Sequence, residues 1–354
     1  NFEDRKLVEI VKATYFNPKI VVIDETTTAL SQEGREELYK HMERIRKSGN
    51  TVIFISHDLP EIIEKSDTIT ILRDGVYIDT VKSKDVNEND LKKLMVGREV
   101  TGDYYRSDYG EKISDEVVLS AKHVTVPGLI EDVSFDLHKG EILGFGGLSE
   151  SGMHEIGKAI FGASYDREGT VELADGTQIN DIPTAIKHSI AYTSKDRDNE
   201  SVVLNQSIGD NICLPSLDEL SGPAHLISDK KKKDFANKFA KQMSVKMVDV
   251  NQFVSNLSGG NKQKVVLARW IGKDSDIVVL DSPTRGIDIK VKQDIYQLMN
   301  QMRKNGKSII MISEELMELI GMCDRIMIMK DGKISGELER DQNLDENGLI
   351  TMMV

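Results

Sequence analysis

The chain has 354 residues, 30% of them charged, and a formal net charge of −13 at pH 7. This acidity argues against a general nucleic-acid binder, because such proteins gain affinity by neutralising phosphates with basic side chains. The two cysteines, Cys213 and Cys323, have no metal-ligand spacing and do not indicate a disulfide framework. No apolar stretch approaches the roughly 18 residues that span a bilayer.

The first hundred residues predict an α/β unit. Short apolar, β-branched runs are typical of buried parallel strands, and amphipathic stretches between them predict helices. An Asp-Gly pair between two such runs predicts a hairpin. The expected elements are helices at 2–16 and 35–47, strands at 20–24 and 51–56, and a hairpin at 69–78.

The rest of the chain repeats this pattern and adds to it. Residues 98–116 are polar and lack periodicity, which predicts a linker. After it we expect strands near 117–135, a strand at 141–146 that leads into a glycine loop, and a helix near 153–161. Further strands at 277–281 and 308–313 and a hairpin at 326–335 match the first unit.

An internal repeat relates the two parts. PKIVVIDETTTAL at 18–30 resembles SDIVVLDSPTRGI at 275–287, and an offset of 257 positions continues without a gap over about 75 residues. In this register Tyr39 matches Tyr296 and Ser56 matches Ser313. We therefore expect two copies of one fold, at 1–97 and 117–354, with a linker at 98–116 and the first copy incomplete at its start.

The loop GLSESGMH at 147–154 has the glycine spacing of a phosphate-binding loop, G-x-x-x-x-G-K-[ST]. Gly147 and Gly152 are in place, but Met153 stands where the lysine belongs and His154 where the Mg²⁺-binding hydroxyl belongs. The loop therefore predicts a backbone cradle without its charge. Nucleotide contact there stays open, and hydrolysis is not expected.

Each copy has a strand that ends in an acid, Asp24 or Asp281, and such an acid can hold Mg²⁺ beside phosphates. The following residue is Glu25 in copy one and Ser282 in copy two. A carboxylate can orient or deprotonate an attacking water, which a serine hydroxyl does poorly.

The residue after the next strand also differs between the copies. His57 of copy one can hydrogen-bond a terminal phosphate, whereas Glu314 in the matching position of copy two would repel it. Copy one thus retains a set suited to hydrolysis, and copy two retains only its strand acid.

The opposite loss affects the turn in NLSGGNKQKVVLARW at 256–270. Ser258, Gly259 and Gly260 enter a helix and direct free N–H groups and a hydroxyl at an anion. Residues 1–3 of copy one, Asn-Phe-Glu, have no such glycines. If each site takes its strand acids from one copy and its turn from the other, every defect falls into a single site.

These segments resemble the ATP-binding cassette (ABC) ATPases. LSGGNKQKVVLARW, LDSPTRGID, IDETTTAL and ISHDL resemble the signature, Walker B, D-loop and switch-histidine segments of that family. The tandem layout, with GEILGFGGLSESGMHEIGKAIFG and PTRGIDIKVK, resembles the ribose/galactose/xylose type of sugar importer ATPase. The resemblance implies two tandem nucleotide-binding domains, each with a RecA-like parallel-sheet core and a helical subdomain.

The resemblance also implies residue roles. Asp24 would bind Mg²⁺, Glu25 would polarise water and His57 would contact the γ-phosphate. The expected ATP-binding residues are Gly147, Gly152, Ser258, Gly259, Gly260, Asn261 and Gln263. The expected D-loops are Thr28, Ala29, Leu30 and Ser31 in copy one, and Arg285, Gly286, Ile287 and Asp288 in copy two. The degenerate site would contain Met153, His154, Asp281, Ser282 and Glu314, and Lys195 falls in the Q-loop region.

The function that the resemblance implies is ATP hydrolysis, with Mg²⁺, that drives monosaccharide import. Membrane-spanning permease subunits would be direct partners at the cytoplasmic face of the membrane, and an extracytoplasmic sugar-binding protein an indirect one. Because the first phosphate loop is expected to precede residue 1, this chain alone is expected to be inactive. Two alternatives stay open: a soluble tandem cassette ATPase that acts on ribosomes or DNA, and a nucleotide-gated regulatory module without hydrolysis.

Overall fold

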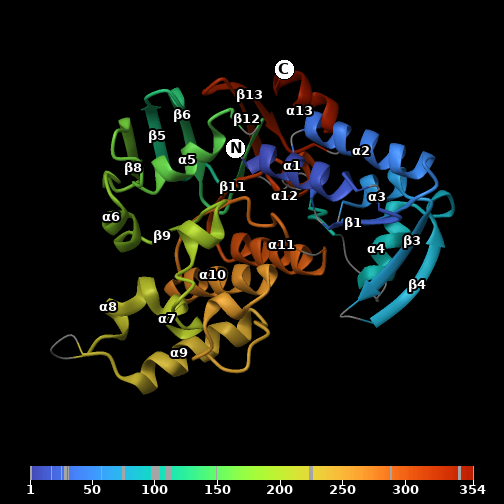
Figure 1. Cartoon of the computed structure of the whole chain (residues 1–354). Helices are drawn as coiled ribbons and strands as arrows, with labels where there is room; N and C mark the ends of the chain where they lie inside the picture. Colours follow the sequence, from blue (N-terminus) through green and yellow to red (C-terminus); the bar gives the residue numbers. More distant parts are fainter. Residues whose placement is uncertain are drawn as a thin grey trace. The chain divides into compact units, whose positions relative to one another are not determined.

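A computed structural model of the chain describes residues 2–16, 18–24, 26–27, 30, 32–56, 58–73, 76–96, 104–108, 113–148, 150–222, 226–287, 289–341 and 344–353. The chain divides into two compact units (Figure 1). Unit 1 comprises residues 1–102 and 288–290, and unit 2 comprises residues 103–287 and 291–354. Six residues with an expected role lie outside the described residues: Glu25, Thr28, Ala29, Ser31, His57 and Asp288.

Unit 1 contains two short sheets and four α-helices within its described residues. β1 (Ile20–Asp24) pairs in parallel with β2 (Thr51–Ile55), and β3 (Thr68–Arg73) pairs antiparallel with β4 (Val76–Lys82). The helices are α1 (Phe2–Thr14), α2 (Gln32–Lys47), α3 (Leu59–Lys65) and α4 (Glu88–Val96). The strands, helices and hairpin that the sequence predicted in this part are therefore confirmed.

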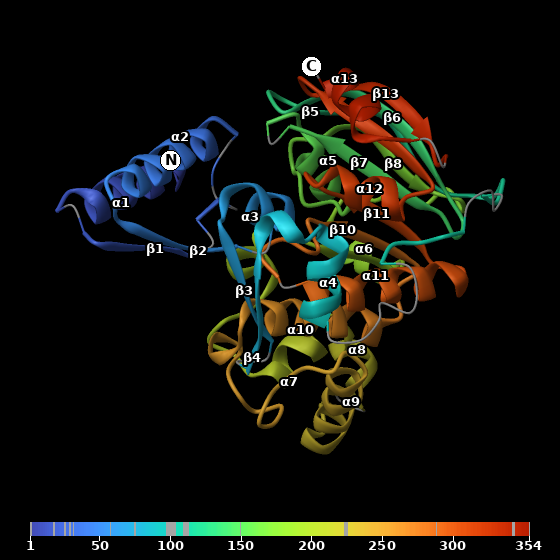
Figure 2. The same ribbon diagram turned by 90° about the vertical axis from the view of Figure 1, so that its right-hand side faces the viewer.

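One face of the β1–β2 pair is covered and the other is open. α1 and α2 lie along the covered face (Figure 2), where Val21, Ile23 and Leu38 are buried. On the opposite face Val22 is 59% exposed, whereas the matching Val279 of copy two is 0% exposed. The repeated strands thus have the same sequence pattern but differ in what covers them.

Unit 2 is built on a six-stranded sheet in the order β13-β12-β7-β11-β10-β9. The strands are β7 (Ile142–Gly147), β9 (Ile190–Thr193), β10 (Ile277–Asp281), β11 (Ser308–Ile312), β12 (Arg325–Lys330) and β13 (Lys333–Glu339). All neighbouring pairs are parallel except β12–β13. A second, antiparallel sheet has the order β6-β5-β8, from β5 (Val117–Val126), β6 (Ile130–His138) and β8 (Glu168–Leu173).

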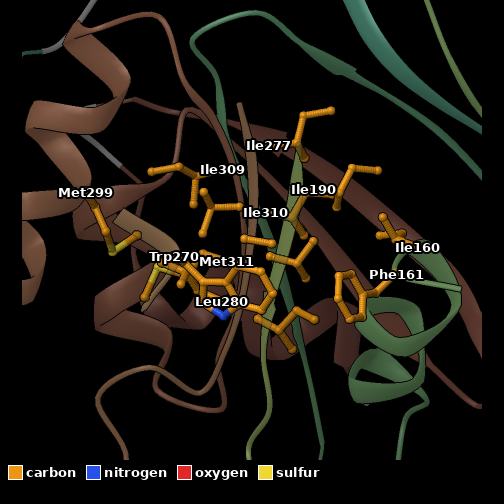
Figure 3. Packing of buried hydrophobic residues seen from close by; sticks show 14 of the residues in the cluster. Ile160, Phe161, Ile190, Trp270, Ile277, Leu280, Met299, Ile309, Ile310 and Met311 are labelled. Atoms are coloured by element: carbon orange, nitrogen blue, oxygen red, sulfur yellow. The ribbon is translucent and has the colours of Figure 1, made fainter. Parts of the chain in front are cut away.

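Helices cover the parallel sheet of unit 2, as expected for an α/β core. The helices described in unit 2, not all of which contact the sheet, are α5 (Met153–Ile160), α6 (Ile182–Lys187), α7 (Ile208–Cys213), α8 (Leu217–Leu220), α9 (Asp229–Gln242), α10 (Gly259–Lys273), α11 (Ile289–Lys304), α12 (Leu316–Met322) and α13 (Glu346–Met353). In Figure 3, Met299 of α11 lies on one side of the central strands, and Ile160 and Phe161 lie on the other. α7, α9 and α10 pack on one another as a helical group.

Part of the expected linker packs on unit 2 instead of running free. The guanidinium of Arg106 is buried: it donates to Asp324 Oδ1 at 2.7 Å and to the carbonyl of Met322 at 2.7 Å. The ring centroids of Tyr104 and Tyr105 lie 5.5 and 5.3 Å from that of Tyr296. Sequence reasoning missed this anchor because a five-residue segment has no periodicity to reveal it.

No helix among the described residues is both long enough and apolar enough to cross a membrane.

Candidate functional site

Both glycines of the loop at 147–154 are required by the backbone. The loop follows the fully buried strand β7 and leads into α5. A Cβ on Gly147 would lie 2.3 Å from Ser151 Oγ and 2.6 Å from the carbonyl oxygen of Met329. Gly152 has a φ of 90°, and a Cβ there would lie 2.5 Å from the carbonyl oxygen of Leu129. The glycines therefore fix a tight turn between strand and helix, as the spacing predicted, whatever the loop binds.

The side chains of the two residues after Gly152 are buried within unit 2. Met153 is completely buried and belongs to the hydrophobic core of unit 2. His154 is also buried, and its Nδ1 donates to Asp281 Oδ1 at 2.7 Å. The side chain at the expected position of the Mg²⁺-binding hydroxyl is thus hydrogen-bonded directly to the strand acid.

Lys195 and Glu314 extend this contact to a group of four charged side chains. Lys195 Nζ donates to Glu314 Oε1 at 2.6 Å and lies 3.0 Å from His154 Nε2, which is 3.4 Å from Glu314 Oε1. We call His154, Lys195, Asp281 and Glu314 the charged cluster. They come from the start of α5 and from the ends of β9, β10 and β11, so the carboxyl edge of the parallel sheet brings them together.

Burial and hydrogen bonding act on His154 in opposite directions. Burial lowers its pKa, but the hydrogen bonds to Asp281 and Glu314 raise it more, so the pKa lies above the ordinary value of 6.5. The imidazole therefore carries positive charge more readily than an exposed histidine does. The cluster thus pairs each of its two carboxylates with a basic side chain.

Asp281 does not offer the donor set that Mg²⁺ prefers. Its Oδ1 accepts from His154 and, at 3.3 Å, from Ser282 Oγ, while Tyr192 donates to its Oδ2 at 3.4 Å. Mg²⁺ requires several oxygen ligands in near-octahedral geometry, and a nitrogen donor occupies the first position here. Within the described ranges, no three His, Cys, Asp or Glu side chains are arranged to hold a metal ion. The residues present do not fit Mg²⁺.

Ser282 has a constrained backbone. Its φ is 49°, in the left-handed region, and its N–H donates to the carbonyl of Ile312 at 2.8 Å. A residue other than glycine in this region is under strain of about 1 kcal/mol.

The Ser-Gly-Gly turn lies at the start of α10, with Ser258 exposed and the two glycines half-buried. Ser258 is the N-cap residue, and its side chain makes no capping bond to the helix. Its Oγ accepts from Asn261 Nδ2 at 2.9 Å, and Asn261 Oδ1 accepts the N–H of Lys246 at 2.7 Å. Gln263 is buried, so it supports the helix from inside. The N–H groups of the first turn therefore have no side-chain acceptor from the cap, as an anion site requires.

Gly286, from the expected D-loop of copy two, lies beside this turn within unit 2. A Cβ on Gly259 would lie 3.5 Å from the carbonyl oxygen of Gly286, and Gly286 itself has a φ of 64°. Arg285 is exposed, whereas Ile287 is buried. The structure thus brings the signature turn and the D-loop of the same copy together.

In unit 1 the structure describes only part of the expected catalytic set. Asp24 is exposed at the carboxyl end of β1. Its oxygen donors suit Mg²⁺. Leu30 of the first D-loop is buried, and its N–H donates to the carbonyl of Thr27 at 3.2 Å. Glu25 and His57 lie outside the described residues.

Both copies contain a buried glutamate network that sequence reasoning missed. In unit 1, Glu61 accepts from Thr27 Oγ1 at 3.0 Å, from Ser56 Oγ at 2.7 Å and from Tyr39. These residues link the segment after the strand acid to the segment before His57.

The same network recurs in unit 2 at the offset of 257. There Glu318 accepts from Thr284, from Tyr296 and from Ser313 Oγ, the last at 2.8 Å. Glu318 is fully buried, and burial raises its pKa. The sequence did contain a signal for this network, because all four residue types match between the copies.

Comparisons with known proteins agree with this architecture. The family model described as ABC transporter matches residues 130–285. The ribose import ATP-binding protein RbsA of Lactococcus lactis subsp. lactis (strain IL1403) is 41% identical over 344 residues, which cover 97% of this chain and 69% of that protein. The xylose import ATP-binding protein XylG of Thermoanaerobacter pseudethanolicus is 42% identical over 350 residues, with 96% and 68% covered.

A solved structure, described as the dimeric structure of MJ0796, a bacterial ABC transporter cassette, supports the fold. It aligns with a TM-score of 0.56 at 22% identity and covers 63% of this chain and 99% of its own. At this identity the match shows the fold alone. Together with the relatives of about 40% identity, these matches show that the chain belongs to the ABC transporter family, as an ATP-binding protein.

Proposed function

We propose that this protein is the ATP-hydrolysing, energy-coupling subunit of an importer for monosaccharides. The relatives named as ribose and xylose import ATP-binding proteins match almost the whole chain, which supports the substrate class. Its partners are membrane-spanning permease subunits, to which it binds from the cytoplasmic face, with a sugar-binding protein as an indirect partner. The sugar is recognised by those other subunits.

The protein has one competent site and one degenerate site. The competent site combines Asp24, Glu25 and His57 of copy one with the turn Ser258–Gly260 of copy two. Asp24 would hold a Mg²⁺ ion, which would supply positive charge beside the transferred phosphate, while Glu25 would orient the attacking water and His57 would contact the terminal phosphate. This assignment follows from the sequence register, in which each copy has lost what the other keeps.

The observation that carries the proposal is the state of the second copy's strand acid. Asp281 Oδ1 accepts a hydrogen bond from His154 Nδ1 at 2.7 Å, and the next residue in the chain is Ser282. This geometry supports the proposal that copy two offers neither a base for water nor a place for the metal, and that hydrolysis depends on the carboxylates of copy one.

Turnover measurements test the assignment. In the full-length protein assembled with its permease, Glu25→Gln is expected to reduce ATP turnover by about a hundredfold or more, because general base catalysis contributes on that scale. Ser282→Glu is the matched change at the other site and is expected to leave turnover within about twofold of the parent protein. Parent-like turnover in Glu25→Gln contradicts the proposal.

A further inference from the structure

We propose that the second copy binds nucleotide without a divalent metal, because the basic side chains of His154 and Lys195 already bond its two carboxylates. The inference rests on the proposed function only in taking residues 147–154 as a nucleotide loop. It goes beyond that function by assigning a metal requirement to the degenerate site.

The first step concerns charge. In an ordinary nucleotide site the strand acid would repel the phosphates, and Mg²⁺ offsets that repulsion. Here Asp281 accepts from His154 at 2.7 Å and Glu314 accepts from Lys195 at 2.6 Å. Both acids are therefore already hydrogen-bonded by basic side chains, and no metal is needed to make room for an anion beside them.

The second step concerns the phosphate donors. The N-cap residue of α5 is Gly152, which gives the first turn of that helix no side-chain acceptor. Uncapped N–H groups and the helix dipole at such an end attract anions. The replacement of the lysine by Met153 removes a side-chain donor, but it leaves these backbone N–H donors in place.

A third observation points to a ligand independently. Ser151 is 4% exposed, yet its Oγ has no hydrogen-bond partner among the described residues. The hydroxyl points back over the first glycine of the loop, 2.3 Å from where a Cβ of Gly147 would lie. Buried hydroxyls are seldom left without a partner, so this one provides a donor for an atom held inside the loop.

Hydrogen–deuterium exchange of the 354-residue chain tests the proposal, with the peptide at 147–156 as the readout. ATP is titrated once with excess Mg²⁺ and once with excess EDTA. Protection of this peptide is expected in both, with half-saturating concentrations within about threefold of each other. Absence of protection in EDTA overturns the proposal, and so does half-saturation at least about tenfold lower with Mg²⁺.

Two variants test the roles of the cations. His154→Ser restores a hydroxyl and releases Asp281, so binding should become at least about tenfold tighter with Mg²⁺ than with EDTA. Lys195→Met releases Glu314 instead. Both side chains of this pair are more exposed than that of His154, and the change should likewise make binding tighter with Mg²⁺ than with EDTA. Circular dichroism checks that each variant folds, and unchanged ratios in both folded variants contradict the proposal.

The matched control is His123→Ser. His123 also pairs with an aspartate, Asp132, at 2.6 Å, but on an exposed surface. The ratio of the half-saturating ATP concentration with EDTA to that with Mg²⁺ should equal that of the parent chain. This readout is separate from turnover: loss of metal-free binding would leave the assignment of Glu25 intact, and parent-like turnover in Glu25→Gln would leave the binding result intact.

Discussion

At the scale of single residues, the buried carboxylate of Glu318 shows most clearly how the fold depends on polar contacts. Tyr296 is 2% exposed and donates to Glu318, while its ring packs against Tyr104 and Tyr105. Burial of Tyr296, followed by the nearby charge of Glu318, raises the pKa of its phenol well above the ordinary value, so the hydroxyl stays a donor.

Tyr296→Phe retains the ring and removes the donor. We expect a loss of about 1–3 kcal/mol in the unfolding free energy, since a buried carboxylate loses a hydrogen bond. Denaturant unfolding should show a lower midpoint with an unchanged slope. Tyr39→Phe is the matched variant in unit 1, where Tyr39 donates to Glu61. A parent-like midpoint for Tyr296→Phe would contradict the expectation.

The sequence shows which residue stands at each expected site position, but it does not show which side chains that residue contacts. The replacement of a lysine by Met153 and of a hydroxyl by His154 was visible in the loop pattern. That His154 would bond Asp281, 127 positions later, was not, because the contact exists only once the strands align. The role of Lys195 was missed for the same reason, since its partner Glu314 lies 119 positions away.

At the scale of elements, the anchor at 104–108 shows how a short segment is held without regular structure. Asp108 accepts from Arg106 Nε at 2.9 Å and also bonds Arg303. Burial raises the pKa of Asp108, but the hydrogen bonds and charges of the two arginines outweigh it, so the pKa lies below 3.8. The carboxylate is therefore held in its charged form.

This shift predicts a loss of stability in acid. A group whose folded pKa is depressed contributes stability that is present above its unfolded pKa and lost as pH falls through the folded pKa. Asp108→Asn should therefore flatten the decline in unfolding free energy below pH 3.8. Denaturant unfolding at a series of pH values measures this, with Asp166→Asn on an exposed turn as the control; an unchanged slope in Asp108→Asn would contradict the assignment.

Element identity was largely readable from the sequence, because buried strands and amphipathic helices have distinct periods. The runs at 277–281 and 308–313 became β10 and β11, and the Asp-Gly pair at 331–332 joins β12 to β13. What covers a strand was not readable. Val22 and Val279 occupy matching positions, yet only the second is buried, because burial depends on neighbours distant in sequence.

At the scale of the whole molecule, the two copies have lost different parts, and we expect repair of one part to be insufficient. The variant Met153→Lys, His154→Ser, Ser282→Glu, Glu314→His restores the loop and strand residues of copy two. Its partner turn, at residues 1–3, still has no glycines. ATP turnover of the full-length variant should therefore stay within about twofold of the parent protein.

Steady-state phosphate release by the assembled transporter measures this. A rise to about twice the parent turnover or more would mean that the turn in copy one is dispensable. Adding Glu25→Gln to the repaired protein separates the sites, because any turnover that remains must come from the repaired copy.

The matching glutamates, Glu61 and Glu318, have a mechanical consequence. Each one accepts hydrogen bonds from a hydroxyl beyond its strand acid and from the serine hydroxyl that precedes His57 or Glu314, so it joins these two segments. Copy two contains this network although Ser282 and Glu314 replace the residues expected for hydrolysis. We therefore expect the two segments that Glu318 joins to respond together when a nucleotide binds to copy two.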